Sequence, residues 1–444
     1  MEKNNPTVTR AWCFYDWANS VYSLVITSTI FPIYFSAVAR RPDGTSVVNF
    51  LGFELDSSVL FTYAISAAFL IIAFLSPFLT AIADYSGRKK MFLQLFCYLG
   101  SLSCAGLYFF TAETFTLSVI LFVLATIGFS GSIVFYNAYL PEIATEDQYD
   151  RLSARGFSMG YIGSVILLIF NLAMIMQPQW FGIAAENSSL PPRIAFLSTG
   201  IWWLGFAQYT FYHLPGNVYQ RKPKGSWILN GFKELKKVLD QVKGLPLLKR
   251  FLLAYFFYNM GVQTVMYLAA IFGEVELRLP SDVLIITILI IQLVAIAGAH
   301  AFARLSEKYG NVRALIVAVI IWIGICIGAY FTHGQLQFYA LAAVVGSVMG
   351  GIQSLSRSTY SKLIPASTKD HASYFSFYDV TEKVSIVLGT LAYGLITQLT
   401  GSMRNSILAL ITFFALGLLF LFLMRSKRLV EAQPESAHAI SGNQ

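Results

Sequence analysis

The chain has 444 residues, of which 56% are hydrophobic and only 12% are charged, and its mean hydropathy is +0.62. A soluble domain usually carries about 25% charged residues, so this composition excludes an ordinary soluble globular protein and predicts a membrane protein. The net charge of +8 does not indicate binding to nucleic acid, because the basic residues gather in alternate loops between apolar segments.

Apolar segments long enough to cross a bilayer recur along the whole chain. A transmembrane helix needs about 20 apolar residues to cross roughly 30 Å of hydrocarbon. The first segment is too long for a signal peptide, is interrupted by Asp16 and has no small-residue cleavage site after it, so we expect it to remain as a span. The pattern predicts an all-α membrane protein with twelve transmembrane helices, near residues 12–39, 58–83, 90–111, 115–140, 153–176, 194–213, 251–273, 282–304, 313–331, 336–360, 375–398 and 404–424.

The distribution of Lys and Arg predicts the orientation of these spans. With the N terminus in the cytoplasm, the inner loops carry most of the basic residues, including nine in the loop 214–250. By the positive-inside rule, both termini are therefore expected to be cytoplasmic. The short termini and the lack of a targeting segment favour a bacterial cytoplasmic membrane. The outer loops keep only five basic residues, which are Arg40, Arg41, Arg193, Arg278 and Arg404.

The two halves of the chain repeat one another. The loop after the second span reads "IADYSGRKK" and the loop after the eighth reads "RLSEKYGNVR". Several matches in one register predict two parallel six-helix repeats, related by an axis along the membrane normal. The matching positions are Asp84 and Glu307, Gly87 and Gly310, and Asp147 and Asp370 at an offset of 223 residues, and Pro141 and Pro365 at 224.

The expected domains follow from this repeat. Residues 1–214 form an N-terminal six-helix bundle, 215–250 a basic cytoplasmic linker, 251–428 a C-terminal six-helix bundle, and 429–444 a disordered cytoplasmic tail. Within the linker, apolar residues recur at helical spacing with lysines on the opposite face. This pattern predicts an amphipathic helix along the inner membrane surface or, alternatively, a solvated linker helix. The apolar positions are Phe232, Leu235, Val238, Leu239 and Val242.

Twelve spans, a six-plus-six repeat and the loop "ADYSGRKK" together resemble the major facilitator superfamily. The family's loop signature is Gly-x-Leu-Ala-Asp-x-x-Gly-Arg-Lys, and the second copy here lacks the Arg–Lys pair. More narrowly, "YDWANSVY" and "QSLSRS" resemble the branch that contains the fungal autophagy-linked vacuolar amino-acid effluxer and its bacterial relatives. The resemblance implies that the loops lock the two halves together on the inner side, through Asp84, Gly87, Arg88, Lys89, Glu307 and Gly310.

Asp84 has a specific expected partner. It lies at the inner end of the second span, and the eleventh span begins at the same membrane surface. The first turn of a helix carries a partial positive charge, so a carboxylate there is stabilised by it. The alternative for the neighbouring basic residues is that they only anchor the topology.

Five ionisable residues lie inside predicted spans, where such groups normally pair or mark a pathway. Three are acids and two are bases, so if all five gather, one carboxylate lacks a partner and is a candidate proton carrier. Glu382 and Asp16 are the candidates, although Asp16, about one turn inside the first span, has a second interpretation as a solvated acid near the headgroups. The alternative for the set is an electrostatic latch without a proton. The residues, for proton coupling or a gate, are Asp16, Arg357, Asp379, Glu382 and Lys383.

The resemblance implies that certain spans line a central cavity, and these spans carry amides and aromatic residues. Such residues predict a neutral pocket for a small zwitterion or a polar neutral solute. Interhelical hydrogen bonding is the alternative role of these amides. The candidate binding residues are Tyr15, Trp17, Asn19, Tyr136, Asn137, Asn259, Gln263 and Gln353.

Small residues also lie on one stripe of the fifth span, at Gly156, Gly160 and Gly163. This spacing permits close approach of another helix. We expect the stripe to slide against a helix from the other half, with static packing as the alternative.

The sequence contains no phosphate-binding loop and no nucleophile elbow, and its four cysteines and five histidines show no metal-ligand spacing. We therefore expect neither a cofactor, a metal nor an enzymatic activity. The prediction is a monomeric secondary transporter that moves a small polar solute by alternating access, coupled to an ion for which the proton is preferred over sodium. Efflux of an amino-acid-like solute is implied by the resemblance. The alternatives are a lipid flippase or a membrane-embedded enzyme that uses the intramembrane acids, or a sensor that binds without transport.

Overall fold

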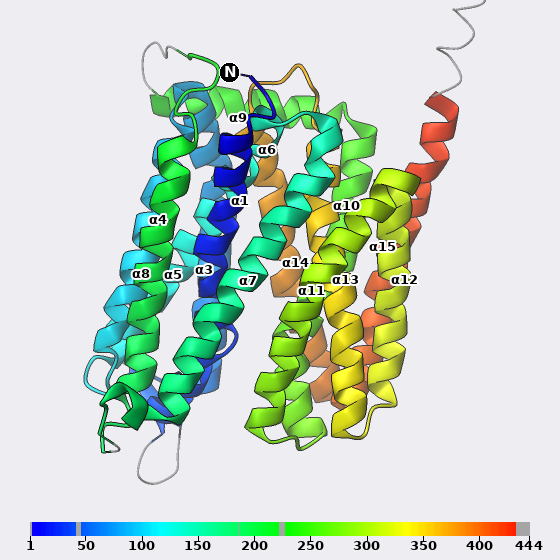
Figure 1. Ribbon diagram of the computed structural model, residues 1–444. Coiled ribbons are helices and arrows are strands. Elements are labelled where there is room, and N and C mark those ends of the chain that lie inside the picture. Colours follow the sequence, from blue (N-terminus) through cyan, green and yellow to red (C-terminus); the bar gives the residue numbers. More distant parts are fainter. Residues whose placement is uncertain (1, 41–45, 185, 222–226, 432–444) are drawn as a thin grey trace, which may run out of the picture.

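The computed structural model describes the chain except for residues 1, 41–45, 185, 222–226 and 432–444, and nearly all described residues are helical (Figure 1). The expected tail, 429–444, therefore lies outside the described residues, apart from the end of the last helix. Lys222 and Lys224 of the linker and Arg41 of an outer loop also lie outside them. The helices are α1 (Pro6–Val21), α2 (Ile30–Ala39), α3 (Ser57–Ser86), α4 (Lys89–Gly106), α5 (Phe115–Asn137), α6 (Leu140–Ile143), α7 (Tyr149–Met176), α8 (Leu190–His213), α9 (Trp227–Lys243), α10 (Pro246–Ile271), α11 (Ser281–Tyr309), α12 (Asn311–Tyr330), α13 (Gln335–Leu363), α14 (His371–Thr400) and α15 (Met403–Glu431).

Eleven helices in the described part of the chain are long and apolar enough to cross a membrane. They correspond to eleven of the twelve predicted spans. The remaining span, predicted at 194–213, is α8, which is not among these eleven helices and packs along α4 and α1. With α8 included, the N-terminal bundle consists of α1 to α8 and the C-terminal bundle of α10 to α15, which is the predicted architecture of two six-span bundles.

The first span is broken. Its α-helix α1 continues as a π-helical segment, η1 (Tyr22–Thr27), before α2 begins. The helix starts at Pro6, because the side chain of Asn5 accepts the backbone N–H groups of Thr7 and Val8. Asp16 therefore lies about 15 Å along the helix axis from the start. This position is further into the helix than the one turn counted from the predicted span, because the helix begins before the apolar stretch.

A short hairpin follows the first span and precedes α3. Its strands are β1 (Val47–Phe50) and β2 (Phe53–Asp56), which pair antiparallel. Leu51 and Gly52 form the turn with positive φ angles of 53° and 92°. The sequence analysis placed a loop here, since four-residue strands leave little hydropathy pattern.

The two bundles stand side by side, and α9 lies across the end of the molecule that carries the N terminus (Figure 1). We call this end the N-terminal face. The bundles approach one another there, and the ribbons of α7 and α11 diverge toward the opposite end (Figure 1). The N-terminal face corresponds to the side on which sequence analysis places the basic loops.

Glycines allow the closest helix contacts within the bundles. A Cβ atom added at Gly298 of α11 would lie 2.1 Å from the backbone oxygen of Ser347 in α13, and one at Gly350 would lie 2.2 Å from the oxygen of Ala295. Neither backbone oxygen can move away as a flexible side chain can. The spacing of α11 and α13 therefore depends on the absence of a side chain at both positions.

We predict that Gly298→Ala lowers the free energy of unfolding by about 1–3 kcal/mol, because the added methyl group forces α11 away from α13. Gly324→Ala in α12 is the matched control, since nothing lies within 4 Å of its Cβ position. Ala is also the better helix former, so this control should be neutral or stabilising. Thermal unfolding of the detergent-solubilised protein measures both, and equal stability of the two variants would contradict the argument.

Candidate functional site

A buried ion pair joins the two bundles. The Nη1 and Nη2 atoms of Arg357, on α13, lie 3.2 and 3.3 Å from Oδ2 of Asp16, on α1. The hydroxyl of Tyr136, on α5, donates to the same oxygen at 2.8 Å. The side chains of Arg357 and Asp16 are only 3% and 6% exposed. A charge this buried is stable only when it is paired and hydrogen-bonded, so neither residue can lose its partner cheaply.

The remaining donors of Arg357 are also satisfied. Nε donates to Oγ of Ser153 at 2.9 Å, Nη2 to the backbone oxygen of Ser153 at 2.9 Å, and Nη1 to Oδ1 of Asn137 at 3.3 Å. With the two contacts to Asp16, all five N–H groups of the guanidinium have an acceptor. The Cζ atom of Arg357 lies 4.3 Å from the ring centroid of Phe157 and 4.8 Å from that of Trp12. Arg357 thus reaches from the C-terminal bundle into a socket built by the N-terminal bundle.

Gly156 of α7 makes room for this ion pair. A Cβ atom there would lie 2.5 Å from Oδ2 of Asp16 and 3.0 Å from Nη2 of Arg357. The other two glycines of the stripe face α1, since Gly160 lies against Ser20 and Gly163 against the backbone of Trp17. The prediction that the stripe meets a helix from the other half was therefore wrong for Gly160 and Gly163, because α7 packs against α1 of its own bundle.

The other three ionisable residues form a second group on α14. Nζ of Lys383 lies 3.1 Å from Oδ1 of Asp379 and 3.7 Å from Oε2 of Glu382, and 5.7 Å from the ring centroid of Phe69 on α3. The expected single cluster of five is therefore two groups, because α13 turns Arg357 toward α1 while α14 turns its charges toward α3. The excess carboxylate belongs to the α14 group, where Glu382 is 21% exposed.

Asp84 contacts the first turn of α14. Its Oδ2 accepts the backbone N–H of Ser373 at 2.7 Å and the Ser373 hydroxyl at 2.8 Å, and its Oδ1 accepts the N–H of Ala372 at 3.3 Å. This is the helix terminus that the sequence analysis assigned to Asp84. The contact joins α3 of one bundle to α14 of the other through donors that the helix itself leaves without partners.

The rest of this loop is arranged within the N-terminal bundle. Gly87 ends α3 with a φ of 69°, and a Cβ there would lie 2.6 Å from the side chain of Asn217. Arg88, immediately before α4, donates its backbone N–H to the carbonyl oxygen of Ala83 in α3. Lys89 forms a buried ion pair with Glu142 of α6. Glu142 was missed by the sequence analysis, although a lone acid in the apolar segment "AYLPEI" was a usable signal.

The second copy of the loop uses different residues. Gly310 keeps a positive φ of 85°, but Glu307 makes only an exposed contact of 3.6 Å with Arg151. Such surface ion pairs contribute little. The buried contact belongs instead to Asp150, at the start of α7, which accepts from Ser306 at 3.0 Å, Asn311 at 2.7 Å and Lys362 at 2.7 Å. Asp150 was also missed, yet pseudo-symmetry with the start of α14 points to this position.

The eight predicted binding residues occupy several places. Tyr136 and Asn137 hold the ion pair, whereas Gln353 accepts from Tyr161 at 2.6 Å across the bundle interface. Asn259 donates to Ser385 at 2.6 Å within the C-terminal bundle, with Gln263 half-buried one turn further along α10. The remaining three lie on α1, namely Tyr15, Trp17 and Asn19.

These three residues of α1 have different surroundings. In the part of the chain that the structure describes, the hydroxyl of Tyr15 and the Nδ2 atom of Asn19 are buried and have no hydrogen-bond partner. Trp17 stacks on Trp202 of α8 at 5.4 Å between ring centroids, and its backbone oxygen accepts the Trp202 indole N–H. The structure thus turns Trp17 toward α8 and away from the C-terminal bundle, because residues one position apart on a helix face different directions.

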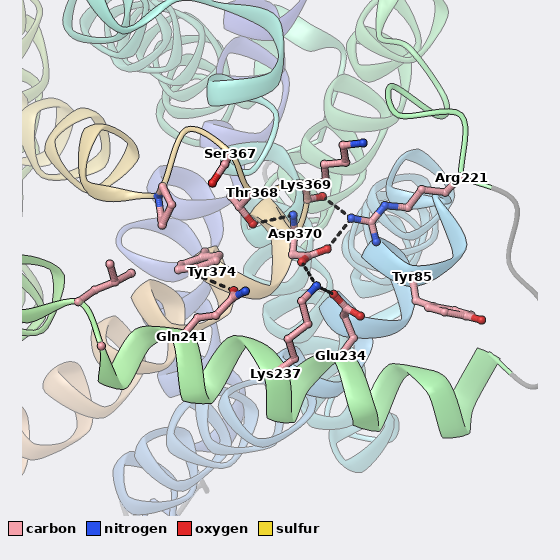
Figure 2. A pocket seen from close by; sticks show the side chains of 13 residues that line it. Tyr85, Arg221, Glu234, Lys237, Gln241, Ser367, Thr368, Lys369, Asp370 and Tyr374 are labelled. Atoms are coloured by element: carbon pink, nitrogen blue, oxygen red, sulfur yellow. Dashed lines mark hydrogen bonds and ion pairs between the residues drawn. The ribbon is translucent and has the colours of Figure 1, made fainter.

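A further polar pocket of about 850 Å³ lies at the N-terminal face, between α9 and the start of α14. Figure 2 shows the side chains of Arg221, Glu234 and Lys237 pointing toward Asp370. Burial opposes ionisation of Asp370, but hydrogen bonds from Glu234, Arg221 and Lys237 outweigh it and lower the pKa of this carboxyl. Burial and the nearby Asp370 raise the pKa of Glu234. The charged form of Asp370 is therefore the form that Arg221 and Lys237 stabilise.

Metal binding finds no support in the described residues, since they contain no group of three His, Cys, Asp or Glu side chains that could hold an ion. The buried charges are instead arranged as links between helices. Three of these links take one partner from either bundle, namely Asp16 with Arg357, Asp84 with the start of α14, and Asp150 with Lys362.

Solved structures show the class of this fold. The proton:xylose symporter XylE covers 94% of this chain and of its own, with a TM-score of 0.70 and 15% identity. The human organic anion transporter MFSD10 covers 95% of this chain and 100% of its own, with a TM-score of 0.69 and 14% identity. At these identities the similarity shows the fold alone, which is that of the major facilitator superfamily.

Sequence comparisons then show the family. Residues 4–433 match the family described as vacuole effluxer Atg22 like. The MFS-type transporter YxiO of Bacillus subtilis (strain 168) is 35% identical over 412 residues, which cover 93% of each chain. Autophagy-related protein 22 of Pyricularia oryzae is 23% identical, over 88% of this chain and 72% of that protein. The chain belongs to the Atg22-like family, and it is a multi-pass membrane transporter and not an enzyme.

We predict that Gly156→Ala loosens the N-terminal face, because the added methyl group displaces Asp16 from Arg357 at a cost of about 1–3 kcal/mol. Cys13, buried on α1 near this pair, reports the opening in a background where the other three cysteines are Ser. Its maleimide labelling should accelerate in Gly156→Ala but not in Gly205→Ala, where nothing lies within 4 Å of the added atom. Equal labelling rates in both variants would refute the positioning role of Gly156.

We predict that Asp84→Ala destabilises the folded protein by about 1–3 kcal/mol, because the N–H and hydroxyl of Ser373 lose their acceptor. Asp147→Ala is the control, since Asp147 is exposed at the same face and should change stability by less than about 0.5 kcal/mol. Chemical denaturation in detergent distinguishes the two, and a matching loss in both variants would show that only surface charge matters.

Proposed function

We propose that the chain is a secondary transporter that moves a small, polar, amino-acid-like solute by alternating access, with both termini in the cytoplasm of a bacterial cell. The observation that carries this proposal is the placement of the links between the bundles. They are Asp84 with α14, Asp150 with Lys362, and Asp16 with Arg357.

All three links lie toward the N-terminal face. Asp84 and Lys362 are within two residues of the ends of their helices, Asp150 is the second residue of α7, and Arg357 is less than two turns from the end of α13. If this face is cytoplasmic, the conformation is closed to the cytoplasm. Opening it requires the same three links to separate, which is the motion that alternating access demands.

Two features support a zwitterionic solute. The α14 group offers a cation and two carboxylates close together, which match the carboxylate and the ammonium of an amino acid. Tyr15 and Asn19 supply buried polar atoms that have no hydrogen-bond partner among the described residues. The family description, vacuole effluxer, supports efflux as the direction. The names of the relatives favour a solute carrier over the flippase, the embedded enzyme or the sensor.

Proton coupling follows from the charge balance of the α14 group. Lys383 has two acidic neighbours, so one carboxylate is unbalanced, and Glu382 is the more exposed of the two. An unbalanced carboxylate at an interface that opens alternately to both sides can take up a proton on one side and release it on the other. Asp16 is the second candidate, with Arg357 as its counter-ion.

The test is flux into proteoliposomes under an imposed pH gradient, with radiolabelled amino acids as probes. We predict gradient-driven flux for the unaltered chain and a loss of at least about tenfold, as for removal of a proton-transfer group, in Glu382→Gln. Asp16→Asn tests the second candidate in the same way.

Glu54→Gln, in the exposed hairpin, is the control and should retain full flux. Unchanged gradient-driven flux in both Glu382→Gln and Asp16→Asn would contradict proton coupling through these acids. Equal flux with and without protein, for every solute class tried, would contradict transport of small polar solutes.

A further inference from the structure

The surface helix α9 presents different side chains on three sides. Its inner side packs on α3, with Leu235 and Val238 buried and a Cβ at Gly231 only 2.6 Å from the side chain of Ile82. Asn230 donates to the hydroxyl of Tyr85, also on α3, at 3.0 Å. The helix is thus fixed to the N-terminal bundle.

The side of α9 that faces the pocket contacts the C-terminal bundle. Nζ of Lys237 lies 3.1 Å from Oδ2 of Asp370, immediately before α14, and the hydroxyl of Tyr374 donates to Gln241 at 3.2 Å. Figure 2 shows these side chains standing on α9 and meeting the residues before and within the first turn of α14. Arg221, from the chain just before α9, binds the same carboxylate. The helix therefore bridges the two bundles across the N-terminal face.

The opposite side of α9 is exposed and mixes apolar and basic residues. Phe232 and Leu239 are 51% and 40% exposed, and Lys236 and Lys243 lie exposed between and beyond them. These four residues, which we call the lipid flank, are spaced four, three and four residues apart and so form one stripe along the helix. Lys243 makes one contact here, an exposed ion pair of 2.9 Å with Asp240.

The lipid flank continues the membrane-facing surface of α3. The ring of Phe232 lies 5.1 Å from that of Phe78, which in turn lies 5.5 Å from that of Phe74. Phe74 is 70% exposed on a helix that spans the membrane. The bilayer that covers Phe74 therefore reaches the neighbouring lipid flank at the level of its headgroups.

Interfacial helices bury apolar side chains at the boundary of headgroups and acyl chains, while long lysine side chains reach the headgroups. Lysines near the surface are attracted by anionic lipids, and the exposed pair with Asp240 is weak enough to be exchanged for a phosphate. We propose that the lipid flank binds anionic lipid headgroups, and that this binding, through Lys237 and Asp370 on the other side of the helix, stabilises the closed N-terminal face.

This proposal does not depend on the solute, so its test needs none. The full chain carries nitroxide labels at Met91→Cys and Lys308→Cys, exposed positions on opposite bundles at the N-terminal face, while the native cysteines stay buried. Pulsed electron paramagnetic resonance then measures the distance between labels in vesicles of phosphatidylcholine, or of phosphatidylcholine mixed with phosphatidylglycerol.

We expect the short-distance population to increase in the anionic vesicles. Lys236→Gln should abolish this increase, whereas Lys233→Gln should retain it, because Lys233→Gln removes the same charge from an exposed position outside the stripe of the lipid flank. Lys237→Gln leaves the lipid flank intact but cuts the link to Asp370, and it should shift the distances to longer values in both vesicles. Identical distances in the two vesicles, an equal loss in Lys236→Gln and Lys233→Gln, or a lipid response that survives in Lys237→Gln would each overturn the proposal.

Discussion

The buried guanidinium of Arg357 is the constraint on which the interface between the bundles depends. A charge without water must keep every donor satisfied, and here the acceptors come from Asp16, Asn137 and Ser153, all in the opposite bundle. The two bundles can separate only if solvent or solute replaces those acceptors. Opening of the N-terminal face and access of water to its interior would therefore occur together, as the alternating access that we propose requires.

Two further contact regions between the bundles, which we call seams, flank this central pair. They show that pseudo-symmetry constrains the positions of the helices more than the identity of the side chains that meet there. At one seam Asp84 of α3 meets the start of α14, and at the other the end of α11 meets the start of α7. The first seam uses a carboxylate against a helix terminus. The second uses Asp150 against Ser306, Asn311 and Lys362. A sequence motif retained in one copy and degraded in the other is thus compatible with two equally closed seams.

The linker helix α9 adds a third connection, and one side of it is the stripe that we propose binds anionic lipid. Because α9 is anchored on α3 and reaches Asp370, any force on α9 acts on the position of α14. Helix α14 also carries Asp379, Glu382 and Lys383, the charges that we propose for solute and proton binding. A contact of α9 at the surface thus acts on the helix that carries the proposed binding site.

Much of the architecture was predictable, because partition of a segment into lipid depends mainly on its own side chains. The spans follow from local hydropathy and loop charge, and the repeat follows from matching loop motifs. The meeting of Asp84 with the eleventh span follows from the helix dipole together with the family resemblance, which implies that this loop joins the two halves. Which residues meet across the interface could not be predicted in this way. The division of the five charges into two groups, the roles of Asp150 and Glu142, and the direction of Trp17 depend on how far each helix is rotated about its own axis. That rotation is set by close packing between helices, such as Gly156 against Asp16, and only the tertiary structure decides it.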